Sequence, residues 1–254
     1  MGTQKICVAV ATHKGGTGKS VTAMALAAGL ARAGKRVLLL DLDPQGHSTI
    51  GLGVDVEPDD PSMRELFADP PKPIQEVIRK TSVSGLDIVP SNIRLAPVAQ
   101  ALYGRTKREE VLRRRLESLG NDYDFVIADC PPSLGPLVDN ALTAADWIVI
   151  PCQMEARAAD GLLDLLAAIR DLKGEGFDAW RILRTRLDAR KTVTNEAVLA
   201  ALEPWKGKLF ETVIPQSEAL NQAQMARASI YDFEPKSTGA IAYQALVDEV
   251  LRLC

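Results

Sequence analysis

Short, continuous apolar runs recur along the chain, bounded by glycine, proline or charged residues. Runs such as ICVAVA at 6–11 lack the polar–apolar alternation of a half-exposed strand. They therefore predict strands buried on both faces of a parallel sheet. We expect strands at 5–11, 36–40, 86–90, 125–128, 147–151, 180–186 and 209–214.

The segments between these runs carry apolar residues at helical spacing. Segment 20–33 is rich in alanine and leucine and stops before Gly34, a typical helix end. The apolar residues of 107–119 are spaced to share one helix face. We expect helices at 20–33, 107–119, 158–173, 195–202, 218–226 and 238–253, with an irregular stretch at 53–73 that holds a short helix near 63–67.

Strands and helices alternate from end to end, which is the pattern of an α/β fold. We expect a mainly parallel, twisted sheet with helices on both faces. No internal repeat, linker or shift in composition divides the sequence. Residues 1–254 are therefore predicted to form a single domain.

Composition narrows the possible functions. The 46% hydrophobic and 25% charged content is typical of a globular protein, and a net charge of −3 leaves any nucleic-acid binding to a local basic patch. The four cysteines are scattered without a C-x-x-C pair, which fits a reducing cytoplasm. No apolar run reaches the ~18 residues of a membrane span, and we expect no signal peptide.

The glycine-rich segment HKGGTGKS at 13–20 joins the first predicted strand to the first predicted helix. In this setting, glycines let backbone N–H groups turn toward phosphate oxygens, and the helix N-terminus favours negative charge. Lys19 would reach the β- and γ-phosphates of a nucleotide, and the Ser20 hydroxyl would bind Mg²⁺. The strict G-x-x-x-x-G-K-[ST] pattern is not met, because His13 takes the place of its first glycine and Lys14 adds a second lysine.

Carboxylates follow two other predicted strands. Asp43 lies in DLDPQG at 41–46, and Asp129 begins DCPP directly after an apolar run. The carboxyl ends of parallel strands meet at one edge of a sheet, where open α/β sheets bind ligands. Asp129 is placed to hold Mg²⁺ through water, and Asp43 is placed to orient an attacking water.

Four motifs in this order resemble those of ParA-type partition ATPases, of the ParA/MinD family with a deviant Walker A loop. They are KGGTGKS at 14–20, DLDPQG at 41–46, DCPPSLG at 129–135 and IPQSEAL at 214–220. The resemblance covers essentially the whole chain. It implies a P-loop NTPase fold and an ATPase that uses ATP and Mg²⁺, with a slow intrinsic rate that a partner protein stimulates.

The resemblance also implies roles for individual residues. Lys14 would cross a dimer interface to the partner's nucleotide, and adenine would lie between the strand end at 185–186 and Pro215. The implied catalytic residues are Lys14, Lys19, Asp43 and Asp129, and the implied metal site is Ser20, Asp43 and Asp129. The implied ATP-binding residues are Lys14, Gly15, Gly16, Thr17, Gly18, Lys19, Ser20, Val21, Thr185, Arg186 and Pro215.

The ATP-bound dimer of such proteins binds DNA nonspecifically and positions a cargo in the cytoplasm, on the nucleoid, with a ParB-like or adaptor protein as activator. This sequence departs from family members that carry arginines after the Ile-Pro at 214–215, since it has Gln216 and Ser217 there. A local basic group offers another DNA surface. The predicted DNA contacts are Arg190, Lys191 and Arg184.

Three other functions share this type of loop. A MinD-like membrane-associated positioning ATPase would need a basic amphipathic C-terminal helix, but 240–253 carries Asp248, Glu249 and a single cation, Arg252. An electron-transfer reductase would need paired cysteines for a shared cluster, with Cys130 and Cys152 as the candidates. A metabolic kinase or synthetase is the third, and the cargo cannot be named from sequence.

Overall fold

The computed structural model describes residues 5–155 and 161–254. Its centre is an eight-stranded sheet in the order β3-β4-β2-β5-β1-β6-β7-β8, parallel except for β3 at one edge. The strands are β1 (Ile6–Val10), β2 (Val37–Asp41), β3 (Arg79–Lys80), β4 (Leu86–Val89), β5 (Phe125–Asp129), β6 (Trp147–Gln153), β7 (Trp180–Leu187) and β8 (Leu209–Pro215).

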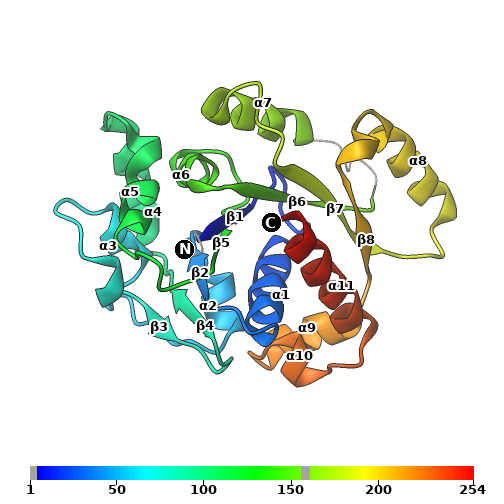
Figure 1. The fold of residues 1–254 in the computed structure, drawn as a ribbon, viewed down its shortest axis with the longest axis horizontal. Helices are drawn as coiled ribbons and strands as arrows, with labels where there is room; N and C mark the ends of the chain where they lie inside the picture. The colour runs from blue at the N-terminus through cyan, green and yellow to red at the C-terminus, as the bar shows by residue number, and fades with distance from the viewer. Residues whose placement is uncertain (1–4, 156–160) are drawn as a thin grey trace.

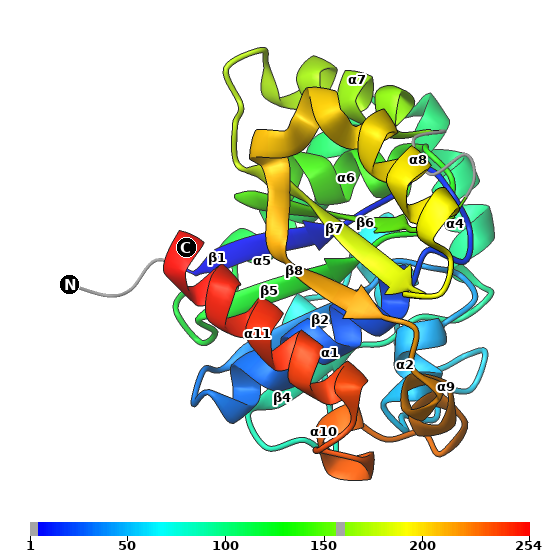
Figure 2. The same ribbon diagram turned by 90° about the vertical axis from the view of Figure 1, so that its right-hand side faces the viewer.

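Helices cover both faces of the sheet (Figures 1 and 2). One layer is built from α1 (Lys19–Arg32), α9 (Glu218–Met225), α10 (Ile230–Phe233) and α11 (Thr238–Leu253). The other layer is built from α3 (Met63–Phe67), α4 (Leu95–Ala101), α5 (Val111–Glu117), α6 (Pro136–Ala144), α7 (Leu162–Lys173) and α8 (Thr192–Leu202).

Successive residues of the central strands pack into the hydrophobic cores on opposite faces of the sheet. Val8 and Val10 of β1 pack with the α1 layer, whereas Cys7 and Ala9 pack with the other layer. This is why β1 needs apolar residues at every position. The small residues of α1 let it approach α11 closely, and a Cβ built on Gly29 would lie 2.5 Å from Val247 Cγ2.

The strand order creates a crevice beside β1. From β1 the chain passes through α1 to β2 on one side, whereas β5 connects through α6 to β6 on the other side of β1. Open α/β sheets bind ligands at such a switch point, outside the carboxyl ends of the strands. In Figure 2 the arrowheads of β7 and β8 point toward the edge where α9 and α2 (His47–Gly51) lie.

The predicted fold class is confirmed, with every predicted strand present within a few residues. Four helices, α2, α4, α6 and α10, and the two-residue strand β3 were not predicted. The predicted helix 107–119 is wrong in extent: Lys107 has a left-handed φ of 54°, Arg108–Glu110 form a 3₁₀ turn, and α5 starts only at Val111. Positions 158–160 of another predicted helix lie outside the described residues, and that helix, α7, begins at Leu162 after Gly161 with φ 75°.

Candidate nucleotide-binding site

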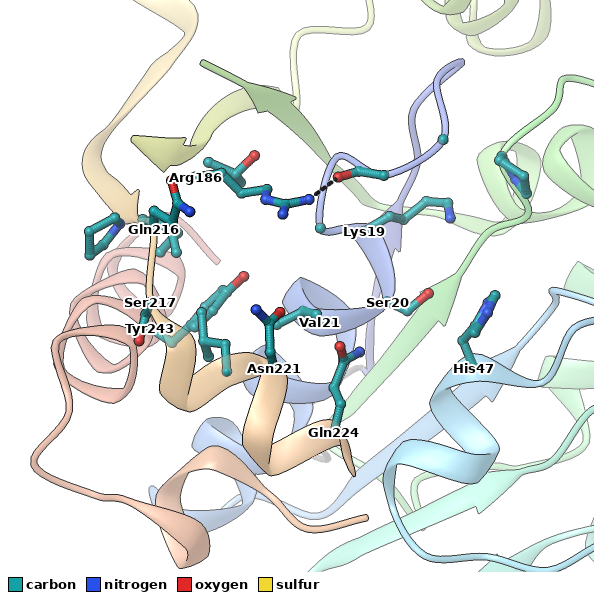
Figure 3. Close-up of a pocket in the computed structure, with 18 of the residues that line it drawn as sticks. Lys19, Ser20, Val21, His47, Arg186, Gln216, Ser217, Asn221, Gln224 and Tyr243 are labelled. Atoms are coloured by element: carbon teal, nitrogen blue, oxygen red, sulfur yellow. Dashed lines mark hydrogen bonds between the residues drawn. The ribbon is translucent and has the colours of Figure 1, made fainter. Parts of the chain in front are cut away.

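A cavity of about 350 Å³ opens at the carboxyl edge of the sheet, between the glycine-rich loop, β7, the end of β8 and α9 (Figure 3). Its polar walls carry an ammonium group at one end and side-chain amides at the other. It is lined by Gly15, Gly16, Gly18, Lys19, Ser20, Val21, Asp43, His47, Pro132, Thr185, Arg186, Ile214, Pro215, Gln216, Ser217, Leu220, Asn221, Gln224 and Tyr243.

The glycine-rich loop takes backbone conformations that require glycine. Gly16 and Gly18 have φ values of 78° and 84°, and Gly18 precedes the first residue of α1. Lys19 is buried at the start of that helix, and the side chain of Ser20 projects from its first turn. The loop thus delivers one cation and one hydroxyl to the cavity at the positive end of a 14-residue helix.

The end of β7 holds the loop from the other side. The buried Thr185 hydroxyl donates a 2.8 Å hydrogen bond to the Thr17 carbonyl oxygen. Arg186 Nη1 donates a 3.1 Å hydrogen bond to the Gly16 carbonyl oxygen, drawn as the dashed line in Figure 3. Arg186 itself has a left-handed φ of 55°, which is uncommon for a residue with a side chain. These contacts fix the loop relative to the far wall of the cavity.

Asp41 and Asp129 are fully buried register partners on β2 and β5. Ser48 Oγ donates to Asp129 Oδ2 at 2.6 Å, whereas Asp129 Oδ1 has no hydrogen-bond partner within the described part of the chain. Burial raises the pKa of Asp129, and Lys19 with the hydroxyls of Ser48 and Ser20 opposes that rise. The pKa of Asp41 is also raised, by burial and then by the charge of Asp129.

Hydrogen bonds to neighbouring residues fix the position of Asp43. Its backbone N–H donates to Asp41 Oδ1 at 3.1 Å, and its own Oδ1 accepts from the Gln45 N–H at 2.9 Å. The residue is nearly buried yet lines the cavity. Among the described residues that line the cavity, Asp43 therefore supplies the one carboxylate, and Lys19 and Ser20 line the same space.

Comparison with known proteins agrees with this geometry. A family model described as an AAA domain matches residues 4–181. The sporulation initiation inhibitor protein Soj of Bacillus subtilis (strain 168) is 39% identical over 251 residues, covering 96% of this chain and 97% of Soj. The chromosome partitioning protein ParA of Myxococcus xanthus (strain DK1622) is 36% identical over 253 residues, covering 96% of this chain and 87% of that protein.

The chain belongs to the ParA-type partition ATPase family. Among solved structures, cobyrinic acid a,c-diamide synthase from Mycobacterium smegmatis, with bound ADP and magnesium, superposes with a TM-score of 0.84. It is 34% identical to this chain, and the match covers 98% of this chain and 95% of that one.

The structure gathers most residues that the resemblance to the ParA family singled out. Of the predicted ATP-binding residues, Lys14 and Thr17 do not line the cavity. Thr17 is buried and contributes its carbonyl oxygen to Thr185, whereas Lys14 is partly exposed. Asp129 lies behind the cavity wall rather than on it. The assigned roles of these residues stay predictions.

Several residues of the ParA-type site were missed. Asn221 and Gln224 of α9 point into the cavity, as do His47 and Tyr243 (Figure 3). The spacing of Asn221 and Gln224 at i and i+3 on a helix was a usable signal, since it puts both amides on one face. His47 and Tyr243 gave no such signal, because only the tertiary fold brings them to the loop.

A magnesium ion fits the residues present. The orphaned buried Oδ1 of Asp129 and the Ser20 hydroxyl offer oxygen atoms of the kind that Mg²⁺ prefers. Within residues 5–155 and 161–254, no group of three or more His, Cys, Asp or Glu side chains could hold a metal ion without help. The phosphate oxygens of a nucleotide and water would complete the ligands of the ion.

The predicted DNA contacts lie near the end of β7 but differ in accessibility. Arg184 is half-buried, and its Nη2 donates to the carbonyl oxygens of Phe210 and Glu211. Arg190 is exposed but makes a two-pronged pair with Asp188, whose pKa it lowers to about 2. Lys191 is exposed at the start of α8. Their role in DNA binding stays a prediction.

Proposed function

We propose that this protein is an ATP-dependent dimerising switch that binds DNA nonspecifically and positions a cargo, with hydrolysis stimulated by a partner protein. The observation that carries this proposal is one cavity that joins Lys19 and Ser20 of the glycine-rich loop to the Asp43 carboxylate. A phosphate chain held by the loop would bring its terminal phosphate toward that carboxylate.

The geometry supports ATP hydrolysis with Mg²⁺ as cofactor. Phosphoryl transfer needs positioning and charge neutralisation more than covalent chemistry. Lys19 would neutralise the β- and γ-phosphates, Ser20 would bind the metal, and Asp129 would support it through water. Asp43 would orient the attacking water. The base would lie toward Thr185, Arg186 and Pro215, where the cavity continues beyond the loop.

Dimerisation is the part of the proposal that gives the switch its nucleotide dependence. Lys14 is partly exposed and stands outside the cavity wall of its own subunit. Such a lysine is placed to meet the phosphates of a second subunit rather than its own. A charge supplied in trans exists only in the dimer, so hydrolysis would be coupled to assembly.

DNA binding is assigned to the exposed pair Arg190 and Lys191 at the start of α8. Nonspecific binding needs cations that can reach backbone phosphates, and both side chains are exposed to solvent. Arg190 would exchange its pair with Asp188 for a phosphate. Arg184 would have to give up two carbonyl acceptors to take part. A DNA-bound state would place the protein on the nucleoid in the cytoplasm, next to a ParB-like or adaptor activator.

The membrane-associated alternative finds less support. The apolar face of α11, with Tyr243, Leu246 and Val250, is buried against the rest of the fold and is not available to lipid. None of the helices within the described residues is long and apolar enough to cross a bilayer.

A redox role also finds less support. Burial raises the pKa of the Cys130 thiol and raises that of Cys152 to about 11, whereas cluster ligation needs thiolates. Iron binding after anaerobic reconstitution would support this alternative.

A metabolic kinase or synthetase is the remaining alternative. Its ATP hydrolysis would not depend on DNA, which the following test measures.

The test is ATP hydrolysis with and without duplex DNA for the parent, Lys19→Ala and Asp43→Ala. We expect Lys19→Ala to lose ATP binding in a calorimetric titration, because the phosphates lose their main cation. Asp43→Ala should bind ATP and dimerise but hydrolyse it at least tenfold more slowly. Near-parent affinity in Lys19→Ala, or a parent ATPase that ignores DNA and never dimerises, would reject the proposal.

A further inference from the structure

His47 stands at the mouth of the cavity, beside the buried carboxylate of Asp43. Its Nδ1 lies 3.7 Å from Asp43 Oδ2, and the two side chains are 61% and 5% exposed. The other oxygen of Asp43 is taken by the Gln45 N–H. The exposed imidazole therefore lies next to Asp43 Oδ2, the carboxylate oxygen that does not accept from Gln45.

The backbone of His47 is held in place by its two successors in α2. Ser48 Oγ donates to Asp129 Oδ2 at 2.6 Å, and Thr49 donates to Asp41 Oδ2 from both N and Oγ1, at 2.8 and 2.7 Å. The Thr49 hydroxyl also accepts from the Ser91 N–H at 2.9 Å. These bonds join α2 to β2, to β5 and to Ser91 in the segment that follows β4, so the imidazole projects from a backbone held at three points.

The neighbours across the cavity define what His47 faces. His47, Ser20 and Arg186 all line the cavity, and in the view of Figure 3 His47 lies on the same side as Ser20, with Arg186 on the other side. Lys19 and Ser20 would hold the terminal phosphate of the nucleotide close to Asp43. The exposed imidazole thus lines the same cavity as the loop and Asp43, within reach of a water held by that carboxylate.

We propose that His47 is a second water-positioning residue for the ATP hydrolysis proposed above, with Nε2 hydrogen-bonded to the attacking water and Nδ1 facing Asp43. The inference rests on the proposed function. The water oxygen bonds to the γ-phosphorus as the bond to the bridging oxygen breaks. ADP leaves with that electron pair, and the water's proton ends on the released phosphate. His47 and Asp43 orient the water and keep no proton.

Two amide substitutions separate the two ring nitrogens. A glutamine can place its terminal polar atom near the position of Nε2, whereas an asparagine reaches only the position of Nδ1. The variants are His47→Ala, His47→Gln and His47→Asn, with Ile50→Ala as a control on an exposed residue of the same helix that lies outside the cavity wall. Single-turnover hydrolysis is measured with DNA and Mg²⁺, together with KM for ATP and the thermal midpoint.

We expect His47→Ala to lower the hydrolysis rate at least tenfold with KM changed less than threefold, and His47→Gln to recover most of that loss. His47→Ala should also weaken binding of ADP with aluminium fluoride, which mimics the transferring phosphate, without weakening ADP alone. A parent-like rate in His47→Ala, or rescue by asparagine but not by glutamine, would overturn the inference while leaving the ATPase intact. If the parent protein itself shows no ATP hydrolysis that depends on Lys19, the proposed function fails instead.

Discussion

Asp41 and Asp129 face each other across adjacent parallel strands, in register and without exposure to solvent. Each carboxylate is held by a hydroxyl of α2, Asp41 by Thr49 and Asp129 by Ser48. Burial raises the pKa of both carboxyl groups above the ordinary value, and the charge of Asp129 raises the pKa of Asp41 further. Ionising both carboxyl groups at neutral pH therefore costs free energy in the folded protein when no metal ion is bound.

This cost predicts that the nucleotide- and magnesium-free protein loses stability as pH rises. Asp41 in the folded protein keeps a proton that the unfolded chain releases near the ordinary pKa of 3.8. The folded state thus binds more protons above that pH, and the free energy of unfolding falls by up to about 1.4 kcal/mol per pH unit until the raised pKa is passed. Urea unfolding at several values between pH 5 and pH 8 measures the slope.

The matched variant for this slope is Asp41→Asn, which cannot ionise. Its absolute stability will change because it rearranges the bonds to Thr49 and Asp43, so the slope is the quantity to compare. We expect a flatter dependence on pH than in the parent, with a residual slope from Asp129. Equal slopes in parent and variant would mean that Asp41 titrates as it does in the unfolded chain.

Thr185→Val should loosen the glycine-rich loop. The substitution keeps the shape of the buried side chain but removes the donor to the Thr17 carbonyl oxygen. A buried acceptor left unpaired costs about 1–3 kcal/mol. We expect a lower thermal midpoint and an ATP affinity reduced severalfold, measured by differential scanning calorimetry and nucleotide titration. Thr185→Ser, which keeps the hydroxyl, is the control and should stay near the parent in ATP affinity.

Much of the fold was predictable because its signals are local. The central strands are buried on both faces, so their apolar runs stand out in sequence. Helix α6 was missed because its start, in PPSLGP at 131–136, resembles a loop, although Pro136 occupies the first helical turn where proline is favoured. The left-handed Lys107 and the 3₁₀ turn after it have no sequence signal, and α5 starts only beyond them.

The candidate site likewise combines residues that the sequence predicts with residues that only the tertiary fold brings to the cavity. The glycine-rich loop is one contiguous motif whose chemistry follows from its residues, and Asp43 and Asp129 follow from the shared edge of a parallel sheet. His47 and Tyr243 reach the cavity only through the packing of α2 and α11, which no single-sequence pattern specifies. The engagement of Arg184 with β8 carbonyl oxygens likewise depends on strand pairing rather than on local sequence.

Arg190→Glu combined with Lys191→Glu should weaken DNA binding without affecting ATP binding. Both residues are exposed and lie outside the nucleotide cavity. The parent's affinity for duplex DNA should fall steeply with salt, because neutralised phosphates release counterions. Fluorescence anisotropy at several salt concentrations measures both affinity and slope. Arg170→Glu, at an exposed arginine of α7, is the control and should leave DNA affinity near that of the parent. If the double variant binds DNA as tightly as the parent, the surface at Arg190 and Lys191 is excluded.

Lys14 should act only between two subunits. Its neighbour His13 is held against α7, with Nδ1 3.3 Å from Asp164 Oδ2 and its carbonyl oxygen 2.5 Å from a Cβ built on Gly161. Lys19 already faces the cavity from within, and a second ammonium about 4 Å away would cost about 1–4 kcal/mol in repulsion, depending on exposure. Lys14 is partly exposed and does not line that cavity, which leaves it able to approach a partner's phosphates.

Lys14→Ala should therefore bind ATP as a monomer with an affinity within about threefold of the parent, because its own phosphates keep Lys19. It should lose ATP-dependent dimerisation, DNA binding and stimulated hydrolysis together, since all three require the dimer. Light scattering with ATP and Mg²⁺, compared with ADP, measures the dimer, and Lys206→Ala on the exposed turn before β8 serves as a surface-lysine control. If Lys14→Ala dimerises on ATP and hydrolyses it at the parent rate, Lys14 is a solvated loop residue. The coupling of hydrolysis to assembly would then need another charge in trans.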